Sequence, residues 1–285
     1  MNPGHPLVKK HIRAGGMAFV LEEGMNGHMI TIYDKEVHTP LLWTHLIPAT
    51  IEGRAMHNVQ NAMFAAALAY NMGIGLEDIR HGLRTFDSTF FQAPGRTNIY
   101  DEHPFKVVLD YAHNPAAVRA MCGLTDRFEV NGRRIVVLAA PGDRRDEDIR
   151  AIAEIAAGHF DFYICRCDDN RRGRGHDEVA TMLKNRLLEC DVPADRIEVI
   201  PDEQEATTRA LEIAVPGDLL LVLGDNIKRS WKQIIYFNSE ARGEEGGKVT
   251  PMRLELPDVA GFDFDADVEI ISDERGVRIA REEGD

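Results

Sequence analysis

The segment Val107–Pro115, with the sequence VVLDYAHNP, decides the fold. Its apolar run is typical of a buried strand that ends at Asp110, and Asn114 can cap a following helix whose first turn takes Pro115. A strand that leads directly into a helix is the repeating unit of a mostly parallel sheet. In such open sheets ligands bind outside the carboxyl ends of the strands, where Asp110 and His113 are expected to lie beside a helix N-terminus that favours anions.

The same alternation continues on the C-terminal side, over residues 96–240. Apolar runs predict strands at Lys106–Tyr111, Arg134–Ala139, Phe160–Cys165, Ile197–Ile200 and Asp218–Leu223, and the intervening patterns predict helices at Pro115–Phe128, Asp146–Ala157, Asp177–Cys190, Glu203–Ala214 and Ile227–Asn238. Short apolar strands between helices indicate a parallel sheet covered on both faces. The expected fold class is therefore α/β and Rossmann-like, although no G-x-G-x-x-G follows the first strand to support dinucleotide binding.

Residues 1–86 predict a smaller unit of a different character. Met17–Glu22 and His28–Tyr33 are β-rich runs separated by a turn, an Ala-rich stretch over 54–70 predicts a helix, and Leu76–Thr85 predicts a second short helix. The segment 87–95 has no clear periodicity and contains Pro94 and Gly95, which is typical of an interdomain linker.

An acidic tail is expected over residues 241–285. It holds 13 Asp and Glu residues against 6 Lys and Arg, so it carries half of the net charge of −14. The alternating run FDFDADVEII at 262–271 can pair as an edge strand, whereas the charge alone favours a loosely ordered, solubilising tail.

Composition excludes several kinds of protein. With 33 basic and 47 acidic residues, the chain has no general basis for binding nucleic acid. No stretch approaches the roughly 18 consecutive apolar residues of a membrane span, and the N-terminal residues lack the apolar core of a secretory signal. The four cysteines do not form a zinc pattern, so a cytoplasmic protein with reduced thiols and no metal site is expected.

The string D-Y-A-H-N-P at Asp110–Pro115 resembles the C-terminal domain of the Mur ligase and folylpolyglutamate synthetase superfamily. The resemblance implies that Asp110 binds the ATP ribose, that His113 lies against the adenine, and that Asn114 belongs to the same nucleotide site. From the residues alone, a strand-to-helix turn capped by Asp and Asn explains the string equally well.

Two further strings resemble the same superfamily. Gly53–Asn61, GRAMHNVQN, is similar to its H-N-x-x-N segment at the end of a central domain, which implies that Asn61 reads the adenine edge. A helix-start cap is the alternative for Asn58 and a less natural one for Asn61. Arg96 follows Pro94–Gly95, where the resemblance implies a catalytic arginine that reaches the ATP phosphates from the mobile domain. The alternative is a surface arginine after a turn.

Two charged loops resemble cyanophycin synthetases in particular. They are Pro141–Ile149, PGDRRDEDI, and Asp168–Gly175, DDNRRGRG, and each follows a predicted strand. In Mur relatives the second loop helps to recognise the incoming amino acid, and we expect Asp168 and Asp169 to face the guanidinium of arginine. Arg171, Arg172 and Arg174 are expected to bind the substrate α-carboxylate or a poly-aspartate acceptor instead. Alternatively, both loops are merely solvated, or the two acids pair with these neighbouring arginines.

The five strings stand in the family's order over about residues 3–238. The resemblance implies a partial Mur ligase central domain followed by a C-terminal domain. It also implies an ATP- and Mg²⁺-dependent amide ligase, homo-oligomeric when complete, that activates a carboxylate as an acyl phosphate. Arginine then joins the side-chain carboxylates of a poly-aspartate backbone, as in cyanophycin. A folylpolyglutamate or peptidoglycan-precursor ligase fragment and a non-catalytic binding subunit are the alternatives.

The phosphate-binding loop G-x-x-x-x-G-K followed by Ser or Thr is absent from the sequence, in which the only Gly-Lys pair, Gly247–Lys248, precedes Val. Such a loop cradles the triphosphate and supplies a hydroxyl to Mg²⁺. We therefore expect the chain to start inside the central domain and to be inactive alone. It can be an excised fragment, a truncated frame or one subunit of a split enzyme.

Overall fold

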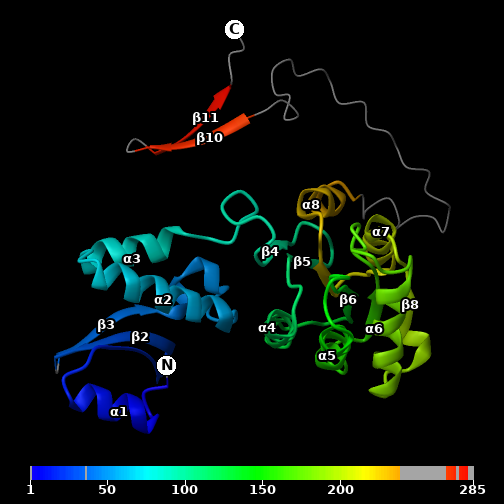
Figure 1. The fold of residues 1–285 in the computed structure, drawn as a ribbon. Coiled ribbons are helices and arrows are strands. Elements are labelled where there is room, and N and C mark those ends of the chain that lie inside the picture. The colour runs from blue at the N-terminus through cyan, green and yellow to red at the C-terminus, as the bar shows by residue number, and fades with distance from the viewer. Residues whose placement is uncertain (1, 36, 238–267, 274–275, 282–285) are drawn as a thin grey trace. The chain divides into compact units, whose positions relative to one another are not determined.

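The computed structural model describes residues 2–35, 37–237, 268–273 and 276–281 (Figure 1). The chain divides into two compact units, Met1–Gly243 and Glu244–Asp285, and each is described by itself. None of the helices in the described ranges is long and apolar enough to cross a bilayer.

The first unit contains the predicted α/β sheet. Its six strands are β4 (Asn98–Tyr100), β5 (Lys106–Asp110), β6 (Arg134–Leu138), β7 (Phe162–Cys165), β8 (Ile197–Val199) and β9 (Leu219–Leu223), in the order β4-β5-β9-β6-β7-β8. All neighbours are parallel except β4 and β5, which are antiparallel. The Rossmann-like class is thus confirmed, and the five predicted strands are present. The edge strand β4 was not predicted because three residues are too few to show a period.

Helices of the described residues cover both faces of this sheet (Figure 1). One face packs against α4 (Pro115–Thr125), α5 (Asp146–Ala156) and α6 (Glu178–Glu189), and the other against α7 (Glu203–Ile213) and α8 (Ile227–Ile235). Alternate residues of each central strand enter the two cores: Val108 and Val136 lie in one, and Val107 and Ile135 in the other. Burial on both faces explains why these strands are continuous apolar runs.

The N-terminal part of the same unit has its own core. An antiparallel sheet of β1 (Ala18–Gly24), β2 (Gly27–Asp34) and β3 (Val37–Trp43) lies beside α1 (Pro6–Arg13), α2 (Met56–Asn71) and α3 (Leu76–Thr85). Short 3₁₀ turns at Thr44–Leu46 and Pro48–Thr50 lead into α2. Strand β3 was not predicted as a separate element, because Pro40 interrupts its pattern. Opposite Pro40, the pairing of β2 with β3 shifts register between Ile30 and Thr31.

The predicted linker 87–95 is packed rather than extended. The Phe90 ring stacks on Trp231 of α8 with centroids 4.8 Å apart and planes 5° apart. The Asn98 side chain accepts a hydrogen bond from the Gly95 N–H (2.7 Å) and donates to two carbonyls of the same segment. These contacts fix the segment on the α/β part. The predicted domain boundaries at 86/87 and 95/96 stay predictions, because residues 1–243 form one compact unit.

The second unit is described only as a hairpin. Strands β10 (Val268–Asp273) and β11 (Gly276–Arg281) pair antiparallel, with Val268 opposite Arg281. Part of the predicted strand at 262–271 therefore lies in β10, and its residues 262–267 fall outside the described ranges. The boundary of the acidic tail at 241 also lies outside them and stays a prediction.

Candidate active site at the carboxyl edge of the parallel sheet

A crevice opens at the carboxyl edge of the sheet, between neighbouring strands whose following helices pack on opposite faces. Strand β9 lies between β5 and β6, and its loop leads to α8 on one face, while the loops after β5 and β6 lead to α4 and α5 on the other. Loops that diverge in this way leave a ligand crevice at the carboxyl edge. Its lining residues are Tyr111, Ala112, His113, Ala139, Ala140, Pro141, Arg166, Asp168, Leu223, Gly224 and Asp225.

Asp110 lies at the end of β5, as predicted, and is 7% exposed. One carboxylate oxygen, Oδ2, accepts hydrogen bonds from the Thr97 N–H (2.7 Å) and from Thr97 Oγ1 (3.2 Å). Burial raises the pKa of Asp110, and the hydrogen bonds from Thr97 and the charge of Arg96 oppose that rise. Asp110 therefore holds the segment that carries Arg96.

His113 and Asn114 continue this turn. The Nδ1 atom of His113 lies 3.0 Å from the Tyr111 carbonyl oxygen, which can only accept, so Nδ1 donates this hydrogen bond and Nε2 makes none with the described residues. The Asn114 side chain accepts from the Ala117 N–H at 3.0 Å, and Pro115 is the first helical residue. Both predicted capping features are present, and the Asn114 oxygen is used for the helix.

Asn61 and Arg96 line a second, mostly apolar cavity of about 550 Å³ formed by α2, α3 and the segment before β4. Helix α2 starts at Met56 with Ala55 as its N-cap, so the alternative of Asn58 as a cap is wrong: its amide instead donates to the Ala49 carbonyl at 2.7 Å. The exposed Arg96 guanidinium lies 5.8 Å from the Tyr111 ring centroid. Tyr111 lines the crevice as well, so Arg96 lies between the two cavities.

The predicted substrate acid Asp168 forms a buried ion pair. Its Oδ1 lies 3.2 Å from Nη1 of Arg166, whose side chain is 1% exposed and also donates to the carbonyl oxygens of Cys167 and Leu223. Burial raises the pKa of Asp168, opposed mainly by the charge of Arg166. Arg166 thereby joins the ends of β7 and β9, and Asp168 stabilises its charge.

Asp169 is also paired. It accepts two hydrogen bonds from Arg229 of α8, at 2.6 and 2.9 Å, which lower its pKa. The alternative in which the two acids pair with Arg171, Arg172 or Arg174 is therefore wrong, because their partners are Arg166 and Arg229. The expected contact of either acid with a guanidinium substrate would require exchange of an existing arginine partner.

Arg174 fastens the two charged loops to each other. Its five N–H groups are directed to Gly142 O (2.9 Å), Arg144 O (2.8 Å), Asp146 Oδ1 (2.7 Å), Glu178 Oε1 (2.8 Å) and Met182 Sδ (3.7 Å). Each donor thus has a partner among the described residues, so the predicted contact of Arg174 with a substrate carboxylate would require one of these hydrogen bonds to be exchanged. The loops also approach closely, since a Cβ on Gly142 would lie 2.2 Å from the Arg171 carbonyl oxygen.

The remaining arginines of the loops differ in their pairing. Arg172 donates to Asp143 at 2.7 Å. The exposed side chains of Arg144 and Arg171 make no hydrogen bond or ion pair with the part of the chain that the structure describes. Of the predicted carboxylate-binding residues, Arg171 is therefore the one that is available to a ligand.

Comparison with known proteins agrees with this geometry. Residues 95–226 match the family model of the Mur ligase glutamate ligase domain. Residues 95–226 are a Mur ligase domain. Over 240 residues the chain is 36% identical to the cyanophycin synthetase of Trichormus variabilis, in a match that covers 82% of this chain and 25% of that protein. The predicted resemblance to cyanophycin synthetases is thus confirmed, and the chain spans about a quarter of the length of the curated relatives it matches.

Solved structures show the same fold. The murein peptide ligase Mpl of Psychrobacter arcticus matches with a TM-score of 0.54 and 17% identity, covering 76% of this chain and 43% of that one. Escherichia coli FolC, solved in complex with DHPP and ADP, matches with a TM-score of 0.53 and 21% identity, covering 76% and 45%. Both matches extend beyond the Mur ligase domain, since that domain alone is under half of the chain.

Two features of the Mur ligase domain were not predicted from sequence. Glu203, fully buried at the start of α7, accepts from the N–H groups of Asp225 and Asn226 and from Ser230 Oγ. It also lies 3.5 Å from Arg166 and 3.3 Å from Arg229. The second feature is Asp225 itself, which enters the crevice after β9. Asp225 could have been predicted as a site residue, because it is an acid that comes just after an apolar strand.

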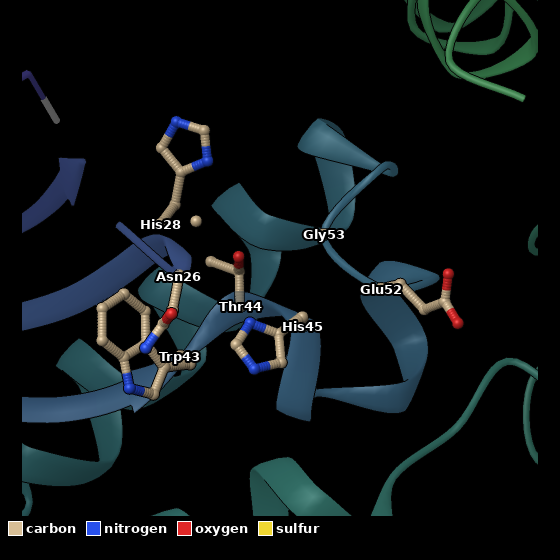
Figure 2. A pocket seen from close by; sticks show the side chains of 8 residues that line it. Asn26, His28, Trp43, Thr44, His45, Glu52 and Gly53 are labelled. Carbon is tan, nitrogen blue, oxygen red and sulfur yellow. The ribbon is translucent and has the colours of Figure 1, made fainter. Parts of the chain in front are cut away.

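A polar groove of about 480 Å³ lies outside this site, between β2, β3 and the turn before α2 (Figure 2). The rings of Trp43 and His45 stack at 6.0 Å, but the Glu52 carboxylate points away from them and is paired with Arg54. The groove therefore lacks a converging set of polar groups. Throughout the described residues no group of three or more His, Cys, Asp or Glu side chains is arranged to hold a metal ion.

Proposed function

We propose that this chain forms the nucleoside- and amine-binding part of an ATP-dependent amide ligase that joins arginine to the side-chain carboxylates of a poly-aspartate backbone. One observation carries the proposal. The D-Y-A-H-N-P turn and both charged loops, which resemble cyanophycin synthetases, leave the same carboxyl edge of the sheet of a Mur ligase domain. A reaction that needs ATP, a carboxylate and an amine requires such a convergence.

The nucleotide would be held by residues from both parts of the first unit. Asp110 offers carboxylate lone pairs to ribose hydroxyls, and His113 presents to the base the Nε2 that makes no hydrogen bond with the described residues. Asn61 is exposed on α2 and offers a carboxamide to the adenine edge. The presence of ADP in the FolC structure supports a nucleotide in a site of this fold.

Arg96 suits the phosphates because it makes no ion pair with the described residues and its guanidinium is exposed beside Tyr111. In the proposed reaction a carboxylate oxygen takes the γ-phosphoryl group of ATP and releases ADP. The neutral amine of arginine then attacks the acyl carbon, loses a proton and expels phosphate. A bound Mg²⁺ would neutralise the phosphate oxygens, and the chain's own contribution to that charge is Arg96.

The acceptor is polyanionic in this proposal, and the unpaired cations of the two loops fit it. Arg144 and Arg171 are exposed, and Arg174 holds their loops together. Exposed guanidinium groups bind carboxylates bidentately. The ligases for folylpolyglutamate and peptidoglycan precursors, and a non-catalytic binding subunit, remain the competing functions, and the choice of amine separates them.

Substitution of Asp110 tests the nucleotide site. In a complete ligase that carries this segment, Asp110→Ala is expected to weaken apparent ATP affinity about ten-fold to a hundred-fold, because a hydrogen bond to a charged group contributes roughly 1.5–3 kcal/mol. Initial rates at varied ATP concentration measure the change.

The matched control for this substitution is Thr97→Val, which removes one hydrogen bond to Asp110 and keeps the backbone N–H. It should leave ATP affinity within about two-fold of the parent. Equal losses in both variants, or an unchanged ATP dependence of Asp110→Ala, would show that Asp110 acts only on the loop that carries Arg96.

A further inference from the structure

The loop after β9 places the carboxylate of Asp225 in the crevice, and none of the five sequence strings contains this residue. Asp225 follows Gly224, and its backbone N–H is fixed by Glu203 at 3.2 Å. Its side chain is partly buried and lines the crevice together with His113, Pro141 and Asp168. It makes no hydrogen bond or ion pair with any side chain in the described ranges.

The carboxylates around it already have partners. Asp168 pairs with Arg166, Asp169 pairs with Arg229, and Glu203 lies within 3.5 Å of both arginines. Three carboxylates therefore share two guanidinium groups, and Asp225 adds a fourth carboxylate to the crevice without an ion pair of its own among the described residues. At the rim, Arg172 pairs with Asp143, and this pair, with smaller contributions from the charges of Asp168 and Asp225, raises the pKa of Arg172.

The balance of charge around Asp225 favours a ligand that carries a positive charge. A buried or partly buried carboxylate without a cation is unfavourable, and a cationic ligand relieves that cost. The hydrogen bond from the Asp225 N–H to Glu203 fixes the backbone at this position, so the side chain starts from a defined point at the crevice before a ligand arrives. This distinguishes it from an exposed acidic residue on a mobile loop.

We infer that Asp225 is the residue that binds the cationic side chain of the incoming amino acid, an inference that rests on the proposed function. In that reaction the side chain is a guanidinium, which is planar and donates two parallel N–H groups to one carboxylate. Asp168 and Asp169 then act as partners of Arg166 and Arg229, and they position the crevice rather than contact the substrate.

The test uses a complete ligase that carries this segment, with arginine as substrate and citrulline as competitor. Citrulline has the shape of arginine and an uncharged ureido group. Asp225→Asn is expected to raise the apparent KM for arginine about ten-fold to a hundred-fold and to leave the KM for ATP within about two-fold. The inhibition constant of citrulline should stay within about two-fold, because it lacks the charge that Asp225 recognises.

Two results would overturn the inference. An unchanged KM for arginine shows that Asp225 does not bind the substrate, and an equal rise in the arginine KM and the citrulline inhibition constant shows that it contacts the shared α-amino group. If the parent enzyme uses ATP with another amine and ignores arginine, the proposed function fails instead. Asp195→Asn, an exposed acid at the opposite edge of the sheet before β8, is the matched control, and thermal melting of each variant verifies folding.

Discussion

The purified 285-residue chain is expected to incorporate no arginine into a poly-aspartate primer in the presence of ATP and Mg²⁺. Its sequence contains no G-x-x-x-x-G-K string with a following Ser or Thr, the loop that cradles the triphosphate and supplies a hydroxyl to Mg²⁺. Stabilisation of the transferring phosphoryl group is the main source of catalysis in this chemistry, and loss of one stabilising arginine alone costs about 10³–10⁵ in rate. Turnover should therefore fall below detection.

Incorporation of labelled arginine into acid-precipitable polymer measures this activity, with a full-length cyanophycin synthetase as the positive control. Contaminating enzyme is recognised because its activity is unaffected by substitutions in the chain. Activity that copurifies with the chain and disappears in Asp110→Ala would show that this segment is catalytically sufficient, against the prediction.

Glu203→Ala is expected to destabilise the α/β part by about 3–5 kcal/mol, the typical cost of removing one partner from a buried charge network. Glu203 is 0% exposed and accepts from the first N–H groups of the loop into α8 and from Ser230. Without it, Asp168 is the one carboxylate in the described residues that still forms an ion pair with Arg166, and the loop that carries Asp225 loses its anchor.

Urea unfolding of the chain, followed by circular dichroism, measures this loss of free energy of unfolding. Glu203→Gln should lose less, since an amide oxygen can still accept from Ser230. The control is Glu205→Ala, two residues later and exposed, which should change stability by less than about 1 kcal/mol. A Glu203→Ala variant as stable as this control would refute the role of Glu203 as a structural centre.

The sequence predicted those parts of the fold that depend on the pattern of apolar and capping residues within a short stretch of chain. The apolar strands, the helices between them and the Asn114–Pro115 helix start depend on residues close in the chain, and each is present. The three-residue strand β4 and the Pro-containing β3 have too little pattern to be recognised. The Ala55 cap of α2 was missed because no side chain caps that helix.

The sequence was least informative about which charged side chains form ion pairs with one another. Three arginines follow Asp169 within five residues, yet its partner Arg229 is 60 positions away. Arg166 contacts the Leu223 carbonyl, 57 positions away, because parallel strands bring distant ends to one edge. Which acid is left unpaired, and so available to a substrate, depends on these distant contacts. For that reason Asp225 emerged only from the structure.

The choice of amine tests the central claim most directly. In a complete ligase that carries this segment, with ATP, Mg²⁺ and a poly-aspartate primer, arginine, glutamate and diaminopimelate are offered one at a time, and phosphate release and polymer mass are recorded. The account predicts that arginine alone supports phosphate release and that the polymer gains arginine residues in proportion to it. Phosphate release driven by glutamate or diaminopimelate, with arginine inert, would contradict it.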